Sequence, residues 1–266
     1  MDNIRALVNN DINTIENNIY NLFNSNNDII KDIENFIKGP SKRVRSIICL
    51  LYLKANNINI NKPIIKILSA GELIHNASLL HDDVIDNSDI RRGEIAFHKK
   101  YDTKTSVLSG DYLLSIAVKE LLELKNDDII QIFLNATTNM SIAELLQYTE
   151  RHKNTSIENY LKIIDGKTAS LFEAILKSTA LLSNIDTIPA GRFGKLFGLL
   201  FQINNDSQND SIINDKKNGI KTIIDIVGIE KTESLKDNYK EEMRKIVRSL
   251  PNKKYSDGLE DLINLL

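Results

Sequence analysis

The chain has 266 residues, 42% of them hydrophobic, and its 34 Lys and Arg residues nearly balance 36 Asp and Glu residues, for a formal net charge of -2. This balance excludes a global electrostatic attraction to nucleic acid or to an anionic membrane, and the apolar content suffices for one large domain. We therefore expect a single domain over residues 1–266. The only cysteine, Cys49, excludes an internal disulfide and a cysteine-based zinc site, and we interpret it as a buried structural thiol.

The N-terminal segment is polar and amphipathic, whereas a signal peptide would combine a basic stretch with an apolar core. No uninterrupted apolar run approaches the ~20 residues that a membrane-spanning helix needs. We therefore expect a cytoplasmic protein without stable membrane insertion.

Apolar residues recur at helical spacing along most of the chain, as in Ile64, Ile67, Leu68 and Ile74. Strand-like alternation is hard to find. Residues 220–229 contain enough β-branched side chains to leave a short strand open, but we favour a helix there. The predicted fold class is all-α. Breaks between helices are predicted at residues 38–42, 55–63, 87–103, 126–128, 154–156, 184–189 and 207–219.

The segment LLHDDVIDNSDIRRG, residues 79–93, places carboxylates at the polar end of an apolar run. On a helix, Asp82 and Asp86 lie one turn apart on one face, with Asp83 beside them and His75 on the same face. A solvated helix end would explain such a cluster, but carboxylates that extend a buried face need a cation. Oxygen ligands suit Mg²⁺, which keeps several waters and shares its other positions with substrate phosphates.

Basic residues follow in the same segment, because Arg91 and Arg92 come directly after the carboxylates. Their guanidinium groups match phosphate oxygens in a bidentate manner. A second basic cluster, Lys42, Arg43 and Arg45, resembles an ordinary solvated basic face when taken alone. Gly166, Lys167 and Thr168 invite a P-loop interpretation, but Leu161 stands where the first glycine would be needed, so a P-loop is excluded.

A glycine-containing apolar segment precedes FQINNDSQND, residues 201–210. We interpret its glycines as sites of close helix packing; they are Gly191, Gly194 and Gly198. A polar helix face follows at spacings of three and four residues and is a candidate second side of the same site. It consists of Gln202, Asn205, Asp206 and Asn209.

Together these segments resemble the trans-isoprenyl diphosphate synthases, or polyprenyl synthetases, over roughly residues 38–222. HDDVID with RRG resembles the first aspartate-rich motif, and PSKRVRS resembles GGKRxRP. LSGDYLLSIA, DGKTASLF and LFGLLFQINND resemble further motifs, in the family's order. The resemblance implies an all-α, isoprenoid synthase-type helical bundle around a deep central cavity, and usually a homodimer.

The resemblance also implies a reaction, in which an allylic prenyl diphosphate ionises, isopentenyl diphosphate condenses with it and a proton is eliminated. Asp82 and Asp86 would hold Mg²⁺, and Asp83 would assist them without direct contact. The residues implied to bind the allylic diphosphate are Arg91, Lys167 and Thr168, with Lys221 as a further candidate. Those implied to bind isopentenyl diphosphate are Lys42, Arg45, His75 and Arg92. Gln202 would line the reaction centre, and His81 is interpreted as structural.

Small side chains at Ala77 and Ser78 occupy the turn before Asp82, where short-chain members of the family carry bulky aromatic residues. Together with the two-residue spacer between Asp83 and Asp86, they resemble the bacterial long-chain enzymes of the octaprenyl and hexaprenyl type. A long product is therefore expected.

The second aspartate motif departs from the family pattern, because Asn205, Asp206 and Asn209 stand at its three acidic positions. A one-residue helical bulge would restore two carboxylates, Asp206 and Asp210, so Asp206 stays a metal candidate. Two hypotheses result. The chain is either an active long-chain trans-polyprenyl diphosphate synthase, or a catalytically weak or inactive prenyl-diphosphate-binding subunit that supports a partner chain.

Overall fold

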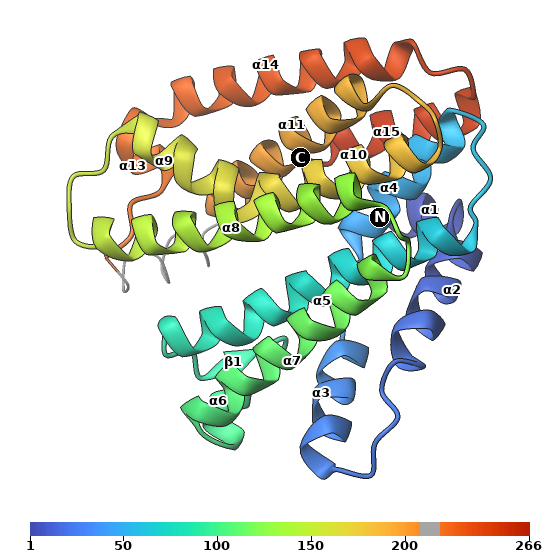
Figure 1. Ribbon diagram of the computed structural model, residues 1–266. Coiled ribbons are helices and arrows are strands. Elements are labelled where there is room, and N and C mark those ends of the chain that lie inside the picture. Colours follow the sequence, from blue (N-terminus) through green and yellow to red (C-terminus); the bar gives the residue numbers. More distant parts are fainter. Residues whose placement is uncertain (208–218) are drawn as a thin grey trace. The chain divides into compact units, whose positions relative to one another are not determined.

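The computed structural model describes residues 1–207 and 219–266, and these residues are helical apart from loops and one short β-hairpin (Figure 1). The hairpin consists of the antiparallel strands β1 (Ile90–Arg91) and β2 (Glu94–Ile95), with Arg91 opposite Glu94. The predicted all-α class is thus confirmed. Within these residues, no helix has the combination of length and apolar character that crossing a bilayer requires.

The chain divides into two compact units, each built from separate stretches of sequence. The first unit comprises Met1–Leu7, Ile48–Asn59 and Gln131–Leu266, and the second comprises Val8–Ile47 and Ile60–Ile130. Because the stretches interleave, no single linker divides the chain into an N-terminal and a C-terminal domain. The single domain over residues 1–266 stays a prediction.

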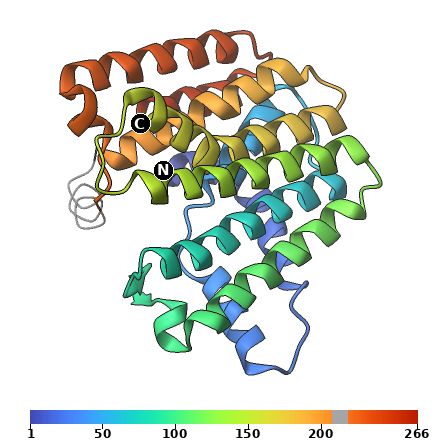
Figure 2. The ribbon, with the colours of Figure 1, turned by 60° about the vertical axis from the view of Figure 1, so that its left-hand side comes forward.

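The second unit is built around the long helix α5 (Lys62–Ile85), which packs against α7 and α2 (Figures 1 and 2). Asn61 caps the start of α5 by accepting a hydrogen bond from the Ile64 amide at 3.0 Å, and Pro63 lies in its first turn. The other helices of this unit are α2 (Asn9–Tyr20), α3 (Asp28–Lys38), α6 (Phe97–Lys100) and α7 (Thr103–Leu122).

A glycine brings α5 and α7 close together immediately before the aspartates. A Cβ atom at Gly110 would lie 2.2 Å from Nε2 of His81, so the glycine leaves room for this imidazole. His81 in turn lies 3.2 Å from the carbonyl oxygen of Val107. The structural role expected for His81 agrees with these contacts.

The first unit packs α10 (Ser170–Leu182) against α11 (Thr187–Asp206), side by side in both ribbon views (Figures 1 and 2). Its other helices are α1 (Asp2–Ala6), α9 (Ile157–Ile164), α13 (Ile223–Val227), α14 (Ile229–Arg248) and α15 (Lys253–Asn264). Two further helices, α4 (Val44–Ala55) and α8 (Asp127–Glu150), begin in the residues of the second unit and continue into those of the first. Cys49 is buried as expected, its Sγ lying 3.2 Å from Oγ1 of Thr179, and burial raises its pKa to about 12.

A π-helical segment, η1 (Asp165–Ala169), joins α9 to α10 and contains Lys167 and Thr168. The sequence did not predict it. π-helical turns are rare and frequently occur at functional sites, where the extra residue alters the direction of the side chains around it. The segment DGKTA, which matches a sequence motif, therefore also has a backbone conformation that is common at functional sites.

Most predicted breaks coincide with the ends of helices. Residues 38–42, for example, begin at the last residue of α3 and end before the start of α4, and residues 184–189 include the start of α11. The helix favoured over residues 220–229 is largely confirmed by α13 and α14, which meet at Gly228 with a positive φ of 83°. The break at 207–219 falls almost entirely outside the described residues.

Candidate functional site

The C-terminal end of α5 presents the first group of carboxylates. Asp82 and Asp86 lie one turn apart, since the Asp86 amide donates to the Asp82 carbonyl oxygen at 2.8 Å, and both side chains are partly exposed. The C-terminus of a helix carries the negative end of its dipole, which adds to the attraction that the carboxylates exert on a cation.

Asp83 is fully buried and pairs with Arg91 of β1. Its Oδ1 accepts hydrogen bonds from Nε of Arg91 at 2.8 Å and from Nη2 of the same guanidinium, whereas Oδ2 has no hydrogen-bond partner within the described residues. One of the arginines predicted to bind phosphate thus also neutralises the middle aspartate of the motif.

These carboxylates fit Mg²⁺ only as part of a shared site. Among residues 1–207 and 219–266, no group of three or more His, Cys, Asp or Glu side chains could by itself hold a metal ion. Mg²⁺ is commonly bound by one or two carboxylates, with waters and substrate phosphates supplying the remaining oxygens. Asp82 and Asp86 satisfy this requirement, whereas Arg91 neutralises Asp83, whose buried Oδ2 accepts no hydrogen bond from the described residues.

Arginines of the second unit gather around His75. Burial lowers the pKa of His75 well below its ordinary value, and the positive charges of Arg45, Arg92, Arg43 and Arg91 lower it further. The ring is therefore neutral at pH 7 and can donate one hydrogen bond. Burial also lowers the pKa of Arg45 to about 10, so this guanidinium stays charged at neutral pH. The structure thus brings four of the predicted binding residues together, whereas Lys42 lies exposed at the surface.

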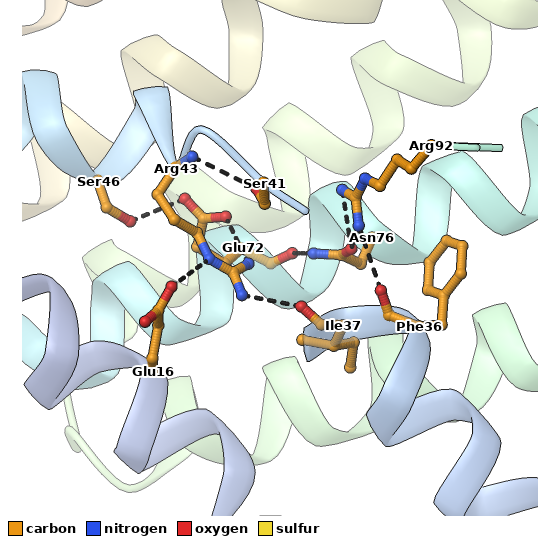
Figure 3. Close-up of polar contacts among 9 residues, drawn as sticks. All are labelled: Glu16, Phe36, Ile37, Ser41, Arg43, Ser46, Glu72, Asn76 and Arg92. Atoms are coloured by element: carbon orange, nitrogen blue, oxygen red, sulfur yellow. Dashed lines mark hydrogen bonds and ion pairs between the residues drawn. The ribbon is translucent and has the colours of Figure 1, made fainter. Parts of the chain in front are cut away.

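Arg43, which the sequence analysis left without a role, forms the centre of a buried network (Figure 3). Its guanidinium donates to Glu16 and Glu72, at 3.2 Å each, and to the carbonyl oxygen of Ile37 at 2.9 Å. Ser46 donates to the other oxygen of Glu72 at 2.7 Å. The sequence held one signal for this network. Glu72 is a single acidic residue in an apolar helical run, and a buried carboxylate needs a buried partner.

The two small side chains predicted to affect product length, Ala77 and Ser78, lie in the turn before Asp82. Ala77 is fully buried, and the Ser78 hydroxyl donates to the carbonyl oxygen of His75 at 2.9 Å. Their effect on product length stays a prediction.

The first unit joins four side chains in a continuous hydrogen-bonded chain. Thr168 Oγ1 donates to Gln202 Oε1 at 2.8 Å, Gln202 Nε2 donates to Asp206 Oδ1 at 2.7 Å, and the Tyr160 hydroxyl donates to Asp206 Oδ2 at 2.7 Å. Burial raises the pKa of Asp206, although both hydrogen bonds and the charge of Lys167 oppose the shift. Three predicted residues therefore meet here, and Tyr160 is an addition that the sequence did not indicate.

The two predicted lysines of this unit differ in their surroundings. Lys167 forms an ion pair with Glu144 at 2.5 Å, and its charge acts on Asp206. Lys221 is exposed and donates to Asn154 at 2.5 Å. Lys167, but not Lys221, therefore acts on the hydrogen-bonded chain from Thr168 to Asp206.

The altered second motif is only partly described. Asn205 is partly exposed in the last turn of α11, which stays α-helical up to Asp206 without a bulge. Asn209 and Asp210 lie outside the described residues, and so does the proposed bulge between Asp206 and Asp210.

Comparison with protein families gives a match to the polyprenyl synthetase model over residues 27–254. The chain is 33% identical over 211 residues to a prenyl transferase of Cyanophora paradoxa, covering 77% of this chain and 65% of that protein. It is 35% identical over 173 residues to the all-trans-nonaprenyl-diphosphate synthase (geranyl-diphosphate specific) of Rhodobacter capsulatus, covering 64% of this chain and 53% of that enzyme. The chain thus spans less than two thirds of either relative.

Solved structures share the fold over nearly the whole chain. A decaprenyl diphosphate synthase from Rhodobacter capsulatus superposes with a TM-score of 0.88 at 22% identity, covering 99% of this chain and 97% of that one. A polyprenyl synthase from Caulobacter crescentus, complexed with calcium and isoprenyl diphosphate, gives 0.83 at 24% identity, covering 99% and 96%. This fold is the isoprenoid synthase-type helical fold that the motifs predict. Because the family match spans most of its length, the chain belongs to the polyprenyl synthetase family.

Proposed function

We propose that the chain is a long-chain trans-polyprenyl diphosphate synthase, which condenses isopentenyl diphosphate with an allylic prenyl diphosphate in a Mg²⁺-dependent reaction. One observation carries the proposal. The second unit combines partly exposed carboxylates at the end of α5 with arginines gathered around a neutral histidine. A metal-bound diphosphate needs both kinds of group, and the family match supports this reading.

Asp82 and Asp86 would hold Mg²⁺ against the allylic diphosphate. When bound, the ion stabilises negative charge on the departing diphosphate. The Caulobacter relative, solved with calcium and isoprenyl diphosphate, supports a divalent cation in this role.

The chain's own residues would bind and orient the two substrates. Arg91, Lys167 and Thr168 are assigned to the allylic diphosphate, with Lys221 as a further candidate. Lys42, Arg45, His75 and Arg92 are assigned to isopentenyl diphosphate. Gln202 is held at both ends of its amide, by Thr168 and by Asp206, so its dipole is fixed before the substrate carbocation forms.

The proposed product is long. Ala77 and Ser78 present small side chains in the turn before Asp82, and the relatives named for nonaprenyl and decaprenyl products support the same reading. We also propose a homodimer, because four apolar side chains of α8 are exposed on one helix face. They are Leu134, Ile142, Leu145 and Tyr148.

A second candidate function is a prenyl-diphosphate-binding subunit with little activity of its own, which supports a partner chain. The hydrogen bonds of Asp206 favour this second function, because both oxygens of the carboxylate accept from protein groups and would have to give up these contacts to bind a metal ion. Asn205, at the first position of the motif, supplies no charge.

The test is incubation of the purified protein alone with Mg²⁺, farnesyl diphosphate and labelled isopentenyl diphosphate. We expect products extended by several isoprene units, lost on addition of EDTA, and a turnover lowered by several orders of magnitude in Asp82→Ala. Asp89→Ala, the same change at an exposed aspartate beyond the motif, should keep wild-type turnover. A folded protein that binds farnesyl diphosphate but forms no extended product would reject the enzyme and favour the subunit.

A further inference from the structure

Arg91 and Arg92 are neighbours in sequence, but different kinds of group hold them. Arg91 pairs with the buried carboxylate of Asp83. Arg92 instead donates to neutral oxygens, with Nη1 and Nη2 each 3.3 Å from Oδ1 of Asn76 and Nη1 3.2 Å from the carbonyl oxygen of Phe36 (Figure 3). Its guanidinium also lies over the Phe36 ring, 5.5 Å from the centroid.

The orientation of Asn76 is fixed by its own hydrogen bond. The side chain is fully buried on α5, and its Nδ2 donates to the carbonyl oxygen of Glu72 at 2.7 Å. The amide oxygen therefore points to Arg92 and cannot exchange places with the nitrogen without losing both contacts.

The Phe36 carbonyl lies in the last turn of α3, where carbonyl oxygens lack intrahelical partners. This end carries the negative end of the helix dipole, which favours a nearby cation. The adjacent carbonyl of Ile37 accepts from Arg43 in the same way. The end of α3 thus fixes two arginines through neutral groups.

The consequence for charge differs between the arginines. Glu16 and Glu72 offset Arg43, and Asp83 offsets Arg91. Arg92 forms no ion pair with a carboxylate of the described residues, and its contacts are to neutral oxygens and an aromatic ring. Burial and then the charges of Arg43 and Arg91 lower its pKa, the charges of Glu72 and Asp83 partly oppose this shift, and a guanidinium stays protonated in proteins. Arg92 therefore stays positively charged, and no carboxylate of the described residues pairs with it directly.

We propose that Asn76 and the Phe36 carbonyl are positioning groups that hold Arg92, through neutral contacts only, as a cation for the diphosphate of isopentenyl diphosphate. This inference rests on the proposed function for the identity of the ligand. A neutral amide is required at position 76 because it orients the guanidinium, whereas a carboxylate there would cancel its charge.

The test is Asn76→Asp, which keeps the size of the side chain and places a negative charge against Arg92. We expect the KM for isopentenyl diphosphate to rise at least tenfold, with kcat changed less than threefold and the KM for the allylic substrate unchanged. Asn61→Asp is the matched control, because it adds the same charge to the exposed N-cap of the same helix, where Asn and Asp cap equally well. Asn76→Ala, which removes the acceptor without adding charge, should raise this KM less than Asn76→Asp does.

A binding experiment separates this inference from the reaction. In calorimetric titrations with isopentenyl diphosphate alone, Asn76→Asp should bind at least tenfold more weakly than the wild type and Asn61→Asp equally well. If the wild type forms no product but this pattern holds, the proposed function fails and the inference stands. Equal binding by the two Asp variants, or no wild-type binding, would overturn the inference even in an active enzyme, as would equal losses in Asn76→Ala and Asn76→Asp.

Discussion

Asp206 shows how its surroundings decide what a carboxylate can do. Its position in the second motif suggests a metal ligand, but the residue is only 8% exposed, and both carboxylate oxygens accept hydrogen bonds, from Tyr160 and Gln202. Through the second bond it fixes the amide of Gln202. If Asp206 positions Gln202, an oxygen that accepts its hydrogen bond is sufficient. If Asp206 binds the metal ion, its negative charge is needed.

We predict that Asp206→Asn retains at least about a tenth of wild-type kcat, because an amide can accept from Gln202 and donate to Tyr160. A metal ligand would lose several orders of magnitude on the same change. Steady-state kinetics at saturating Mg²⁺ distinguish the two roles. Asp206→Ala, which removes both hydrogen bonds, is the comparison variant and should lose more activity than Asp206→Asn.

The stability of the same variant should depend on pH. Burial raises the folded-state pKa of Asp206 above its ordinary value of 3.8, so its contribution to stability is present below pH 3.8 and is lost as pH rises through the folded pKa. Asp206→Asn lacks this loss, and its free energy of unfolding relative to wild type should be higher at pH 7 than at pH 4. Urea denaturation at both values measures it.

Among the elements, the pairing of η1 with α11 is the contact that brings Thr168 to Gln202. It depends on Gly198, where a Cβ atom would lie 2.5 Å from the Cα of Ala169. Backbone cannot move aside as a flexible side chain does, so the two segments approach this closely only with glycine at this position. Gly191, on the same helix, would meet only ordinary contacts at 3.7 Å.

We predict that Gly198→Ala destabilises the protein by about 1–3 kcal/mol, because overpacking forces η1 and α11 apart. Gly191→Ala, the matched control, should be neutral or stabilising by up to about 1 kcal/mol, since alanine favours helices. Thermal unfolding followed by circular dichroism measures both. A neutral Gly198→Ala would contradict the packing argument.

At the scale of the whole molecule, each unit supplies one part of the proposed chemistry. The second carries the carboxylates and the arginines, and the first carries the chain from Thr168 to Asp206. The exposed apolar face of α8 is the basis of the proposed homodimer.

We predict that the protein elutes as a dimer, at twice the chain mass of 30.1 kDa, in size exclusion with light scattering. Leu145→Glu should shift it to the monomer, because the proposed interface at α8 would bury the introduced charge. Ile188→Glu, at an isolated exposed position on α11, should leave the mass unchanged. A wild-type monomer at micromolar concentration would contradict the proposal.

The sequence determined the features that depend on local spacing. Helical periodicity and breaks located most helices, and a spacing of four residues placed Asp82 and Asp86 one turn apart, because a helix repeats every ~3.6 residues. The π-helical turn η1 was not predicted in this way, because no residue in DGKTA is specific to a π-helix.

Only the tertiary structure decided which polar groups meet. Arg43 pairs with Glu72 across 29 positions, Arg92 with Asn76 across 16, and Tyr160 with Asp206 across 46. Such contacts form because packing buries both partners, and a buried polar group needs whichever partner the fold brings near it. The sequence by itself therefore supplied the charged groups and the family, and the packing of the helices decided which charges are neutralised and which stay available to a diphosphate.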